Sequence, residues 1–478
     1  MAQTTIARVC CPSMTSRTLP LGKKNLPKPL PLRKLIGPSF IILGLGLGSG
    51  EVILWPYLAS NFGLGIVWAM AIGITMQFLI NMEVERYALV RGESIFVGFA
   101  RMWKWLPVWF ILSTFLGFGW PGIGLAGATL LAGAFDVEQI RIVGIVVFLT
   151  IGAILSLGAV LYKTVETLEK YLIIIGVPCI VILTYWFAEP ADIVELGRGL
   201  IGQGNGFLFL PMGIVIGQFF GAIAYAGAGG NLNLAQSFYV RDKGYGMGAY
   251  ADRITSVITG KGAQKKFRLT GQTFPLTKEN LRRYHQWWRT MNLEHLMIFW
   301  ALGLFTMLTL TLLAYVTVYG MEGNAQGILF VIHEAIVIGE RTLPIIGTAF
   351  LIITGIMLCA TQLTVLDSTS RIMTENFLLL RRAGKVRVSA VYYAILWIQI
   401  FFGITVFLIG FDQPLTLITL GAIINAFTMF SYIGLLLWIG NRMLPNPLRP
   451  SAWRNIALAA SFLFFGVFCV LTLIEKLS

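Results

Sequence analysis

A carboxylate at the end of a glycine-rich run is the residue with the clearest capacity for chemistry. Residues 44–51 read Gly-Leu-Gly-Leu-Gly-Ser-Gly-Glu, inside a stretch that is otherwise apolar. Glycine costs a helix about 1 kcal/mol per residue relative to alanine, so this run predicts an interrupted helix. Interrupted backbone is tolerated in a bilayer only where it lines a cavity or is buried by protein. The candidate substrate-binding residues of this run are Gly48, Ser49, Gly50 and Glu51.

Three roles are open for Glu51. Ionisable groups within membrane spans are functional-site candidates by default. Glu51 could contact a substrate or ion, carry a proton, or accept backbone N–H groups at the start of a second half-helix. Ser49 could donate a hydrogen bond to an anion, because half-helix N-termini carry partial positive charge.

A second glycine cluster lies in a later apolar stretch. Residues 221–231 read Gly-Ala-Ile-Ala-Tyr-Ala-Gly-Ala-Gly-Gly-Asn, and Asn233 and Gln236 follow. We expect those two to satisfy backbone groups freed by the break, whereas Asn231 could equally contact the substrate. The alternative for both clusters is close glycine packing between continuous helices. The candidates here are Tyr225 (through its carbonyl), Ala228, Gly229 and Asn231, and Glu51 with Asn231 is the candidate metal-ligand pair.

The composition shows what must position these residues. The chain has 478 residues, of which 56% are hydrophobic and 12% charged, about half the charged share of a typical globular protein. Apolar runs near 20 residues, the length that spans a bilayer, recur throughout. We therefore predict an all-α polytopic membrane protein with about eleven transmembrane helices. They are expected near residues 36–58, 64–82, 106–133, 142–162, 169–187, 208–240, 296–319, 345–366, 388–411, 414–438 and 455–474.

The charge distribution predicts the orientation. With a cytoplasmic N-terminus, 32 of the 36 Lys and Arg fall on the cytoplasmic side, which is the positive-inside pattern. The net charge of +14 is scattered over six loops, so the partner it suits is anionic lipid rather than nucleic acid. Residues 1–35 are expected to be a basic cytoplasmic tail. The cysteines imply no disulfide framework, and the sequence implies no cofactor and leaves the oligomeric state open.

The two glycine clusters fall in spans one and six, five helices apart. A repeat of five helices must insert its second copy upside down, and paired interrupted spans in inverted halves point to a transporter site. We predict a single transporter domain over residues 36–475, with repeat one at about 36–187, repeat two at about 208–438 and an extra helix at about 455–474. Residues 241–293 form a cytoplasmic loop whose end, 279–289, should lie at the membrane interface or form a solvated turn. Residues 328–340 are too short to cross and should lie along the external surface.

Several flanking motifs resemble those of the Nramp family of divalent-metal transporters, a LeuT-fold group. Residues 37–40, Gly-Pro-Ser-Phe, resemble that family's Gly-Pro-Gly-Phe, and residues 86–92, Arg-Tyr-Ala-Leu-Val-Arg-Gly, resemble its Arg-Leu-Gly-Ile-Val-Thr-Gly. Residues 166–169 and 373–378 are weaker matches. The resemblance runs in order over roughly residues 36–440. It implies a LeuT-like 5+5 inverted repeat with discontinuous helices 1 and 6.

The motifs that carry the family's chemistry are replaced. Residues 48–51, Gly-Ser-Gly-Glu, stand where the family has Asp-Pro-Gly-Asn, and residues 228–231, Ala-Gly-Gly-Asn, stand where it has Met-Pro-His-Asn. Trp120 and Ile123 align with the family's acidic proton carriers, and Gly421 with a family glutamine. The remaining ligands are oxygens, which suit a hard ion such as Mg²⁺ better than Mn²⁺ or Fe²⁺.

Other polar residues carry secondary expectations. Trp120 with Pro121 should kink span three, and Trp120 could wall the cavity. Asp367 should form an ion pair with Arg371 rather than a coupling-ion site. A last group is formed by Glu83, Glu85 and Arg86. We favour a wetted helix end for these residues over a salt-bridge cluster.

These features favour a secondary carrier in the plasma membrane of a bacterium, working by alternating access on a small inorganic, Mg-like divalent cation. The alternatives are a carrier of a small anion or organic solute, and a non-transporting receptor or scaffold in which residues 241–293 are the working part. We expect no enzyme activity. The spans offer Glu51 and no histidine, so they lack a nucleophile with its base and a multi-ligand metal site.

Overall fold

The computed structural model describes residues 21–29, 38–157, 161–204, 206–251, 269–324, 326–381, 387–411 and 413–477. Cys10, Cys11 and Gly37 lie outside this part of the chain, as do the side chains of Ser49, Glu166 and Glu169. The elements up to residue 199 are α2 (Pro38–Gly48), the π-helix η1 (Ser49–Leu54), α3 (Trp55–Phe62), η2 (Leu64–Ile66), α4 (Val67–Arg91), α5 (Ile95–Met102), α6 (Leu106–Phe118), α7 (Gly122–Ala134), α8 (Ile140–Leu157), α9 (Leu161–Phe187) and α10 (Pro190–Gly199).

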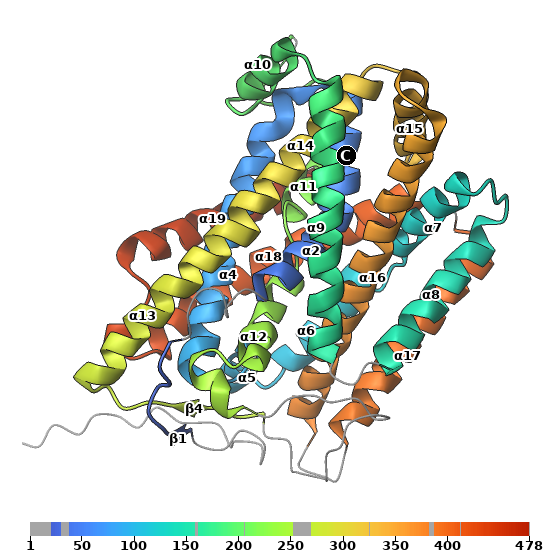
Figure 1. Cartoon of the computed structure of the whole chain (residues 1–478). Coiled ribbons are helices and arrows are strands. Elements are labelled where there is room, and N and C mark those ends of the chain that lie inside the picture. The colour runs from blue at the N-terminus through green and yellow to red at the C-terminus, as the bar shows by residue number, and fades with distance from the viewer. Residues whose placement is uncertain are drawn as a thin grey trace, which may run out of the picture.

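The later helices continue the bundle (Figure 1). They are α11 (Ile216–Ala224), α12 (Leu232–Lys243), η3 (Gly246–Tyr250), α13 (Lys278–His295), the π-helix η4 (Leu296–Leu302), α14 (Gly303–Val318), α15 (Leu329–Arg341), α16 (Pro344–Leu380), α17 (Val388–Ile409), α18 (Pro414–Arg442), η5 (Asn446–Leu448) and α19 (Ala452–Leu477).

Four short strands form two small sheets. β1 (Gly22–Lys23) pairs in parallel with β4 (Gln272–Thr273), and β2 (Gln203–Gly204) pairs antiparallel with β3 (Phe207–Leu208). They lie at opposite ends of the bundle, the first beneath α13 and the second beside α10.

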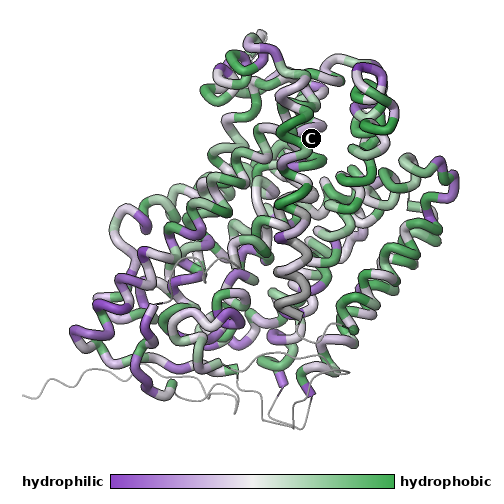
Figure 2. Tube along the Cα trace, in the orientation of Figure 1, coloured by the Kyte–Doolittle hydropathy of each residue, from purple (hydrophilic) through white to green (hydrophobic). Residues whose placement is uncertain are grey.

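Eight helices in the described residues are long and apolar enough to cross a membrane, and up to ten if each bent pair is one span. Span six does not meet the length criterion because its halves, α11 and α12, have only 9 and 12 residues. The eleven predicted spans correspond in order to α2–η1–α3, α4, α6–α7, α8, α9, α11–α12, η4–α14, α16, α17, α18 and α19. Figure 2 shows apolar residues along the bundle and polar residues gathered around α13 and the loops. The prediction of a helical polytopic membrane protein is confirmed.

Span eight is the central helix. In the most apolar 18-residue segment of α16, 72% is buried inside the protein, whereas the corresponding share is 28% in α8 and in α19. Large apolar side chains such as Ile142, Val146, Leu463 and Val467 are exposed on those two outer helices. Apolar side chains facing outward from a helix this hydrophobic identify the surface that lipid covers.

Besides the π-helix η4 at the start of span seven, spans one, three and six depart from regular α-helix in the described residues. Span one bends by 43° between Ser39–Leu45 and Gly50–Phe62, with the π-helix η1 at the bend. The predicted interruption is thus present, although its form is a widened helical turn rather than extended backbone. Span six is fully broken over residues 225–231, as predicted. Span three breaks between α6 and α7, where the prediction placed a kink at Trp120 and Pro121.

Two predicted surface segments have defined structures. Residues 279–289 belong to α13, which continues through η4 into α14 as one 41-residue helical stretch. Tyr284 and Trp287 are buried in it, so this segment is a packed extension of span seven. Residues 328–340 correspond to α15, which lies at the opposite end of the bundle from α13 (Figure 1).

Candidate functional site

The break in span six is made of left-handed glycines held by a glutamine from span two. Gly227, Gly229 and Gly230 have φ values of 140°, 73° and 46°, which side-chain-bearing residues rarely adopt. Gln77 accepts a hydrogen bond from the Gly229 N–H at 3.0 Å and donates one to the Ala224 carbonyl at 3.0 Å. One buried amide therefore satisfies both sides of the break, as buried backbone requires.

Spans one and six touch at Gly50 and Tyr225. A Cβ added to Gly50 would lie 1.7 Å from the Tyr225 carbonyl oxygen, so only glycine fits at this position. Gly48 packs in the same way against Thr361 of α16, whose hydroxyl donates to the Gly44 carbonyl at 3.1 Å. Of the predicted residues, Gly50 and Tyr225 are thus brought together by close backbone packing, whereas Gly48 packs against the Thr361 side chain.

Glu51 faces span seven. Its carboxylate is fully buried, and Oε2 accepts a hydrogen bond from Thr306 at 2.7 Å. Oε1 has no hydrogen-bond partner within the described residues and lies near Gly303. A buried carboxylate with one free oxygen is costly unless it binds a proton or a cation.

Asn231 faces span three instead. Its amide donates to Ser113 at 2.8 Å and to Thr114 at 2.9 Å, while its own oxygen has no partner in the part described. The two proposed metal ligands, Glu51 and Asn231, therefore contact different helices. The described residues contain no group of three or more His, Cys, Asp or Glu that could hold a metal ion.

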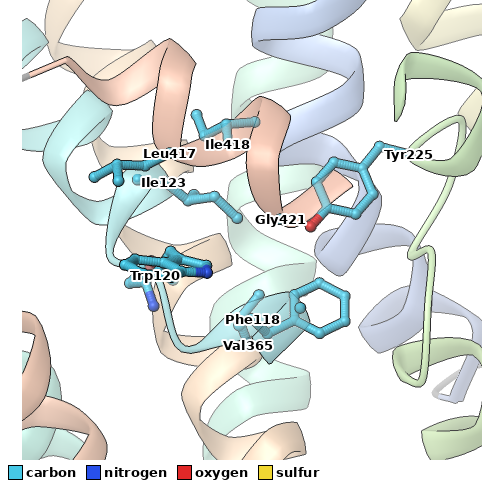
Figure 3. Close-up of a pocket in the computed structure, with 11 residues that line it drawn as sticks. Phe118, Trp120, Ile123, Tyr225, Val365, Leu417, Ile418 and Gly421 are labelled. Atoms are coloured by element: carbon cyan, nitrogen blue, oxygen red, sulfur yellow. The ribbon is translucent and has the colours of Figure 1, made fainter. Parts of the chain in front are cut away.

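A cavity lies between spans three, six, eight and ten (Figure 3). Its interior holds about 10 Å³, roughly the space of one water molecule, so the cavity is almost closed in this structure and far smaller than ligand pockets of about 300–1,000 Å³. None of its lining residues carries a charge. They are Gly117, Phe118, Trp120, Gly122, Ile123, Tyr225, Gln362, Val365, Leu417, Ile418 and Gly421.

Aromatic rings and one amide organise the cavity. Phe118 stacks on Tyr225 with 5.9 Å between ring centroids, and the Tyr225 hydroxyl points toward Gly421 (Figure 3). The Asn425 amide of α18 donates to that hydroxyl at 2.8 Å and to the Gly117 carbonyl at 2.9 Å. Asn425 thus ties the break in span three to the break in span six, and its buried Oδ1 has no partner among the described residues.

The second half of span three begins at the cavity. Gln362 of α16 accepts a hydrogen bond from the Gly124 N–H at 3.0 Å, which satisfies one of the free donors at the start of α7. Trp120 lies between the two halves and its indole donates to the Leu116 carbonyl at 3.0 Å. The expectation that Trp120 walls the cavity is confirmed, and Ile123 and Gly421 line it too.

Sequence reasoning missed Gln77, Gln362 and Asn425. Each is an uncharged amide in an apolar span, at most 2% exposed, that bonds to a broken segment. Amide side chains inside a membrane commonly form hydrogen bonds between helices. Their presence in otherwise apolar spans could therefore have identified these residues from the sequence.

Ion pairs gather at the α13 end of the bundle. Arg371 Nε lies 2.9 Å from Asp367 Oδ2, so the predicted ion pair is confirmed, and Arg371 Nη1 lies 2.8 Å from Asp242 Oδ2. The expectation of a wetted helix end at Glu83 and Arg86 is wrong. Their Oε2 and Nε atoms are 2.6 Å apart and both side chains are buried, because α13 and α19 cover this end of α4.

Two further predictions are revised at this end, the one for Glu85 and the one for the amides that follow the break in span six. Glu85 is buried as well, and the Gln236 amide donates to it at 2.6 Å. His295 lies immediately before span seven, outside the spans as expected, and is fully buried where α13 meets η4. Asn233 bonds to the Tyr432 hydroxyl at 3.0 Å, so both amides that follow the break satisfy side chains rather than backbone.

No protein-family model and no curated protein sequence matches the chain. Solved structures do. The manganese transporter of Eremococcus coleocola, in complex with an aromatic bis-isothiourea substituted compound, is 13% identical, with a TM-score of 0.62 over 97% of this chain and 90% of that one.

Two other solved structures match over similar lengths. MhsT in complex with L-phenylalanine is 11% identical, with a TM-score of 0.52 over 91% of this chain and 98% of that one. Mhp1, a nucleobase-cation-symport-1 family transporter in a closed conformation with bromovinylhydantoin bound, is 13% identical, with a TM-score of 0.53 over 94% and 92%. The chain therefore has the LeuT fold that these transporters share.

Proposed function

We propose that the chain is a secondary transporter, a divergent relative of the Nramp family, that moves a small organic solute by alternating access around the cavity. The fold supports the carrier class, and so does the position of the cavity beside two broken spans. In transporter folds, interrupted helices commonly form the substrate site. The predicted orientation, with the N-terminus cytoplasmic, belongs to the same proposal.

The chemistry of the cavity lining is the observation that favours an organic substrate. Its walls are aromatic and aliphatic, and its polar side-chain groups are the Tyr225 hydroxyl, the Gln362 amide and the Trp120 indole. Ligand sites for small organic molecules combine apolar walls with a few polar groups in this way. The ligands bound in the MhsT and Mhp1 structures, L-phenylalanine and bromovinylhydantoin, are also small organic molecules. A solute with a ring or an apolar part and few polar groups matches the chemistry of this lining, and the cavity must widen to admit it.

A second candidate is the hard divalent cation expected from the sequence. The observation that favours it is the buried, unpartnered Oε1 of Glu51. Thr306 and backbone carbonyls would complete an oxygen-only site there, and hard ions such as Mg²⁺ accept such ligands with several waters. Asn231 faces α6 and would not share this ion in the present arrangement.

Uptake into proteoliposomes tests the proposal. L-phenylalanine, a substituted hydantoin, Mg²⁺, Mn²⁺ and Ca²⁺ are offered separately to purified protein. We expect saturable uptake of an organic probe that falls at least about tenfold in Trp120→Ala. The matched control is Trp103→Ala, because Trp103 is 52% exposed and lies outside the cavity.

Two other outcomes would redirect the assignment. Saturable Mg²⁺ flux that Glu51→Ala abolishes and Trp120→Ala spares would replace the organic solute with the cation. Absence of flux for every probe, in protein shown to be folded, would reject the carrier and favour a receptor or scaffold.

A further inference from the structure

The polar side chains that line the cavity offer a solute hydrogen-bond donors. The Trp120 indole is already used, because it donates to the Leu116 carbonyl at 3.0 Å. The oxygen of the Gln362 amide is used as well, since it accepts the Gly124 N–H at 3.0 Å. The part of Gln362 that remains for a ligand is its NH₂ group, which can only donate. The third polar side chain, Tyr225, decides whether an acceptor is also available.

The orientation of the Asn425 amide shows that Tyr225 is a donor too. Asn425 Nδ2 lies 2.9 Å from the Gly117 carbonyl oxygen and 2.8 Å from the Tyr225 hydroxyl oxygen. A carbonyl oxygen only accepts hydrogen bonds, so the Asn425 atom that faces it must be the NH₂ nitrogen. The same nitrogen therefore donates to the Tyr225 hydroxyl, and the hydroxyl proton has no acceptor within the described residues.

The free hydroxyl of Tyr225 is accessible from the cavity. Figure 3 shows it pointing toward Gly421, on the side where Ile123 lies. Gly421 leaves room beside it, because a side chain there would start 3.4 Å from the hydroxyl oxygen. Phe118 stacks on the ring of Tyr225 and holds it in this direction. The interior has space for about one water molecule, so the acceptor of a larger solute reaches the hydroxyl when the cavity widens.

The cavity offers no countercharge for an ion. None of its lining residues is charged. Glu51, the carboxylate of span one, bonds to Thr306 of span seven and is not part of the lining. A carboxylate or an ammonium group moved from water into such a site would lose its hydration without an opposite charge to replace it. A neutral acceptor such as a carbonyl oxygen loses much less, and it pairs with a buried donor that otherwise stays unpaired.

We propose that the solute carries an uncharged hydrogen-bond acceptor, such as an amide or lactam carbonyl, on a ring or another apolar body, and that the Tyr225 hydroxyl donates to this acceptor. Asn425 positions the hydroxyl, and the aromatic and aliphatic walls cover the apolar body. The proposal rests on the proposed function, because it takes the cavity as the substrate site. It also narrows that function: a free amino acid and a divalent cation become poor ligands of this site, whereas a substituted hydantoin fits.

Three probes with the same ring and different polar groups test the choice of acceptor. They are para-fluorobenzamide, para-fluorobenzoate and para-fluorobenzylamine, which at neutral pH are uncharged, negative and positive. Fluorine NMR of each probe with purified wild-type protein in detergent measures its dissociation constant without any need for transport. We expect para-fluorobenzamide to bind at least about tenfold more tightly than either charged probe, because only the charged probes must give up ionic hydration.

Tyr225→Phe tests the donor. It removes the hydroxyl and keeps the ring that stacks on Phe118, so the affinity for para-fluorobenzamide should fall at least about fivefold. The affinities for the two charged probes should stay the same. Tyr185→Phe is the matched control, because Tyr185 is 87% exposed and lies outside the cavity, and this variant should bind all three probes like wild type. Nonspecific partition of the probes into detergent is the same for both variants.

Four results would overturn the inference. They are equal affinity of wild type for the three probes, tighter binding of a charged probe, an unchanged affinity of Tyr225→Phe for para-fluorobenzamide, and absence of para-fluorobenzamide binding to folded wild-type protein. If Tyr225→Phe fails to fold, the comparison of the three probes on wild type still decides between a neutral and a charged ligand.

Uptake into proteoliposomes separates this inference from the proposed function. Saturable uptake of L-phenylalanine or a substituted hydantoin that Trp120→Ala reduces, but that Tyr225→Phe leaves unchanged, would keep the carrier function and reject the role of Tyr225. Binding of para-fluorobenzamide that depends on Tyr225, in protein that carries no probe, would keep the acceptor site and reject the carrier function.

Discussion

Gln77 and Gly229 are joined by a hydrogen bond of 3.0 Å that fixes the break in span six. The other end of the same amide binds the Ala224 carbonyl, so a single side chain spans the gap between α11 and α12. The break is therefore a defined backbone structure, supported by span two. Gly50 of span one then packs on the adjacent Tyr225 carbonyl.

Replacement of Gln77 by leucine should destabilise the protein. It leaves the Gly229 N–H and the Ala224 carbonyl buried without this partner, at about 1–3 kcal/mol for each group. Thermal unfolding in detergent measures the effect. Gln286→Leu, at an exposed position on α13, is the control. Equal melting temperatures for the two variants would mean that the break supports itself.

Gly50→Ala should be far more damaging than Gly197→Ala. The added Cβ at Gly50 would meet a backbone carbonyl at 1.7 Å, which cannot rotate away, so a loss above about 3 kcal/mol or misfolding is expected. At Gly197 of α10 nothing lies within 4 Å, and alanine should stabilise by up to about 1 kcal/mol. Expression level and melting temperature of the pair test this, and a mild effect at Gly50 would contradict the close approach.

The interruptions in spans one and six could be predicted because glycine's helix cost is a local property of the sequence. The same reasoning could not predict the backbone conformation of each interruption. Span one stays helical as a π-turn, whereas span six opens into left-handed glycines. Those forms depend on partners from other spans. Gln77 is 152 residues from Gly229, and Asn425 is 200 residues from Tyr225.

Burial at the ends of the spans was harder to predict for the same reason. Glu83 and Glu85 resemble a solvated helix terminus when only their neighbours in sequence are considered. Their partners Arg454 and Gln236 are 371 and 151 residues away. A charge pattern that is local in sequence therefore says little about whether α13 and α19 cover it.

Asn425 and Tyr225 should show a measurable energetic coupling. Asn425→Ala removes the donor to the Tyr225 hydroxyl and to the Gly117 carbonyl, at about 1–3 kcal/mol, and Tyr225→Phe removes only the acceptor. A double-mutant cycle on unfolding should give an interaction of about 0.5–1.5 kcal/mol. Tyr185→Phe, at a side chain that is 87% exposed, should be additive with Asn425→Ala. Additivity of Tyr225→Phe would mean that the hydroxyl contact adds no stability.

Arg371→Ala should cost about 3–5 kcal/mol, because it leaves the buried Asp367 carboxylate without its cation and Asp242 with Arg241 alone. The surface pair of Arg198 and Glu195 offers the contrast. Arg198 is 61% exposed there, and Arg198→Ala should change stability by less than about 1 kcal/mol. Equilibrium unfolding of both variants provides the comparison, and similar values for the two would show that the buried pair adds little to stability.

Glu51→Gln tests whether the negative charge of Glu51 binds a cation or whether the side chain has only a packing role. Glutamine keeps an oxygen that can accept the Thr306 hydroxyl and removes the buried charge, so in Mg²⁺-free buffer the variant should be as stable as wild type or more stable by about 1–3 kcal/mol. Glu51→Asp, which shortens the side chain, should lose the Thr306 contact and melt lower. If wild type instead gains stability as MgCl₂ is added, by about 2.7 kcal/mol at a hundredfold excess over its dissociation constant, and Glu51→Gln does not, the carboxylate binds a cation. That outcome would favour the cation over the organic solute as the transported species.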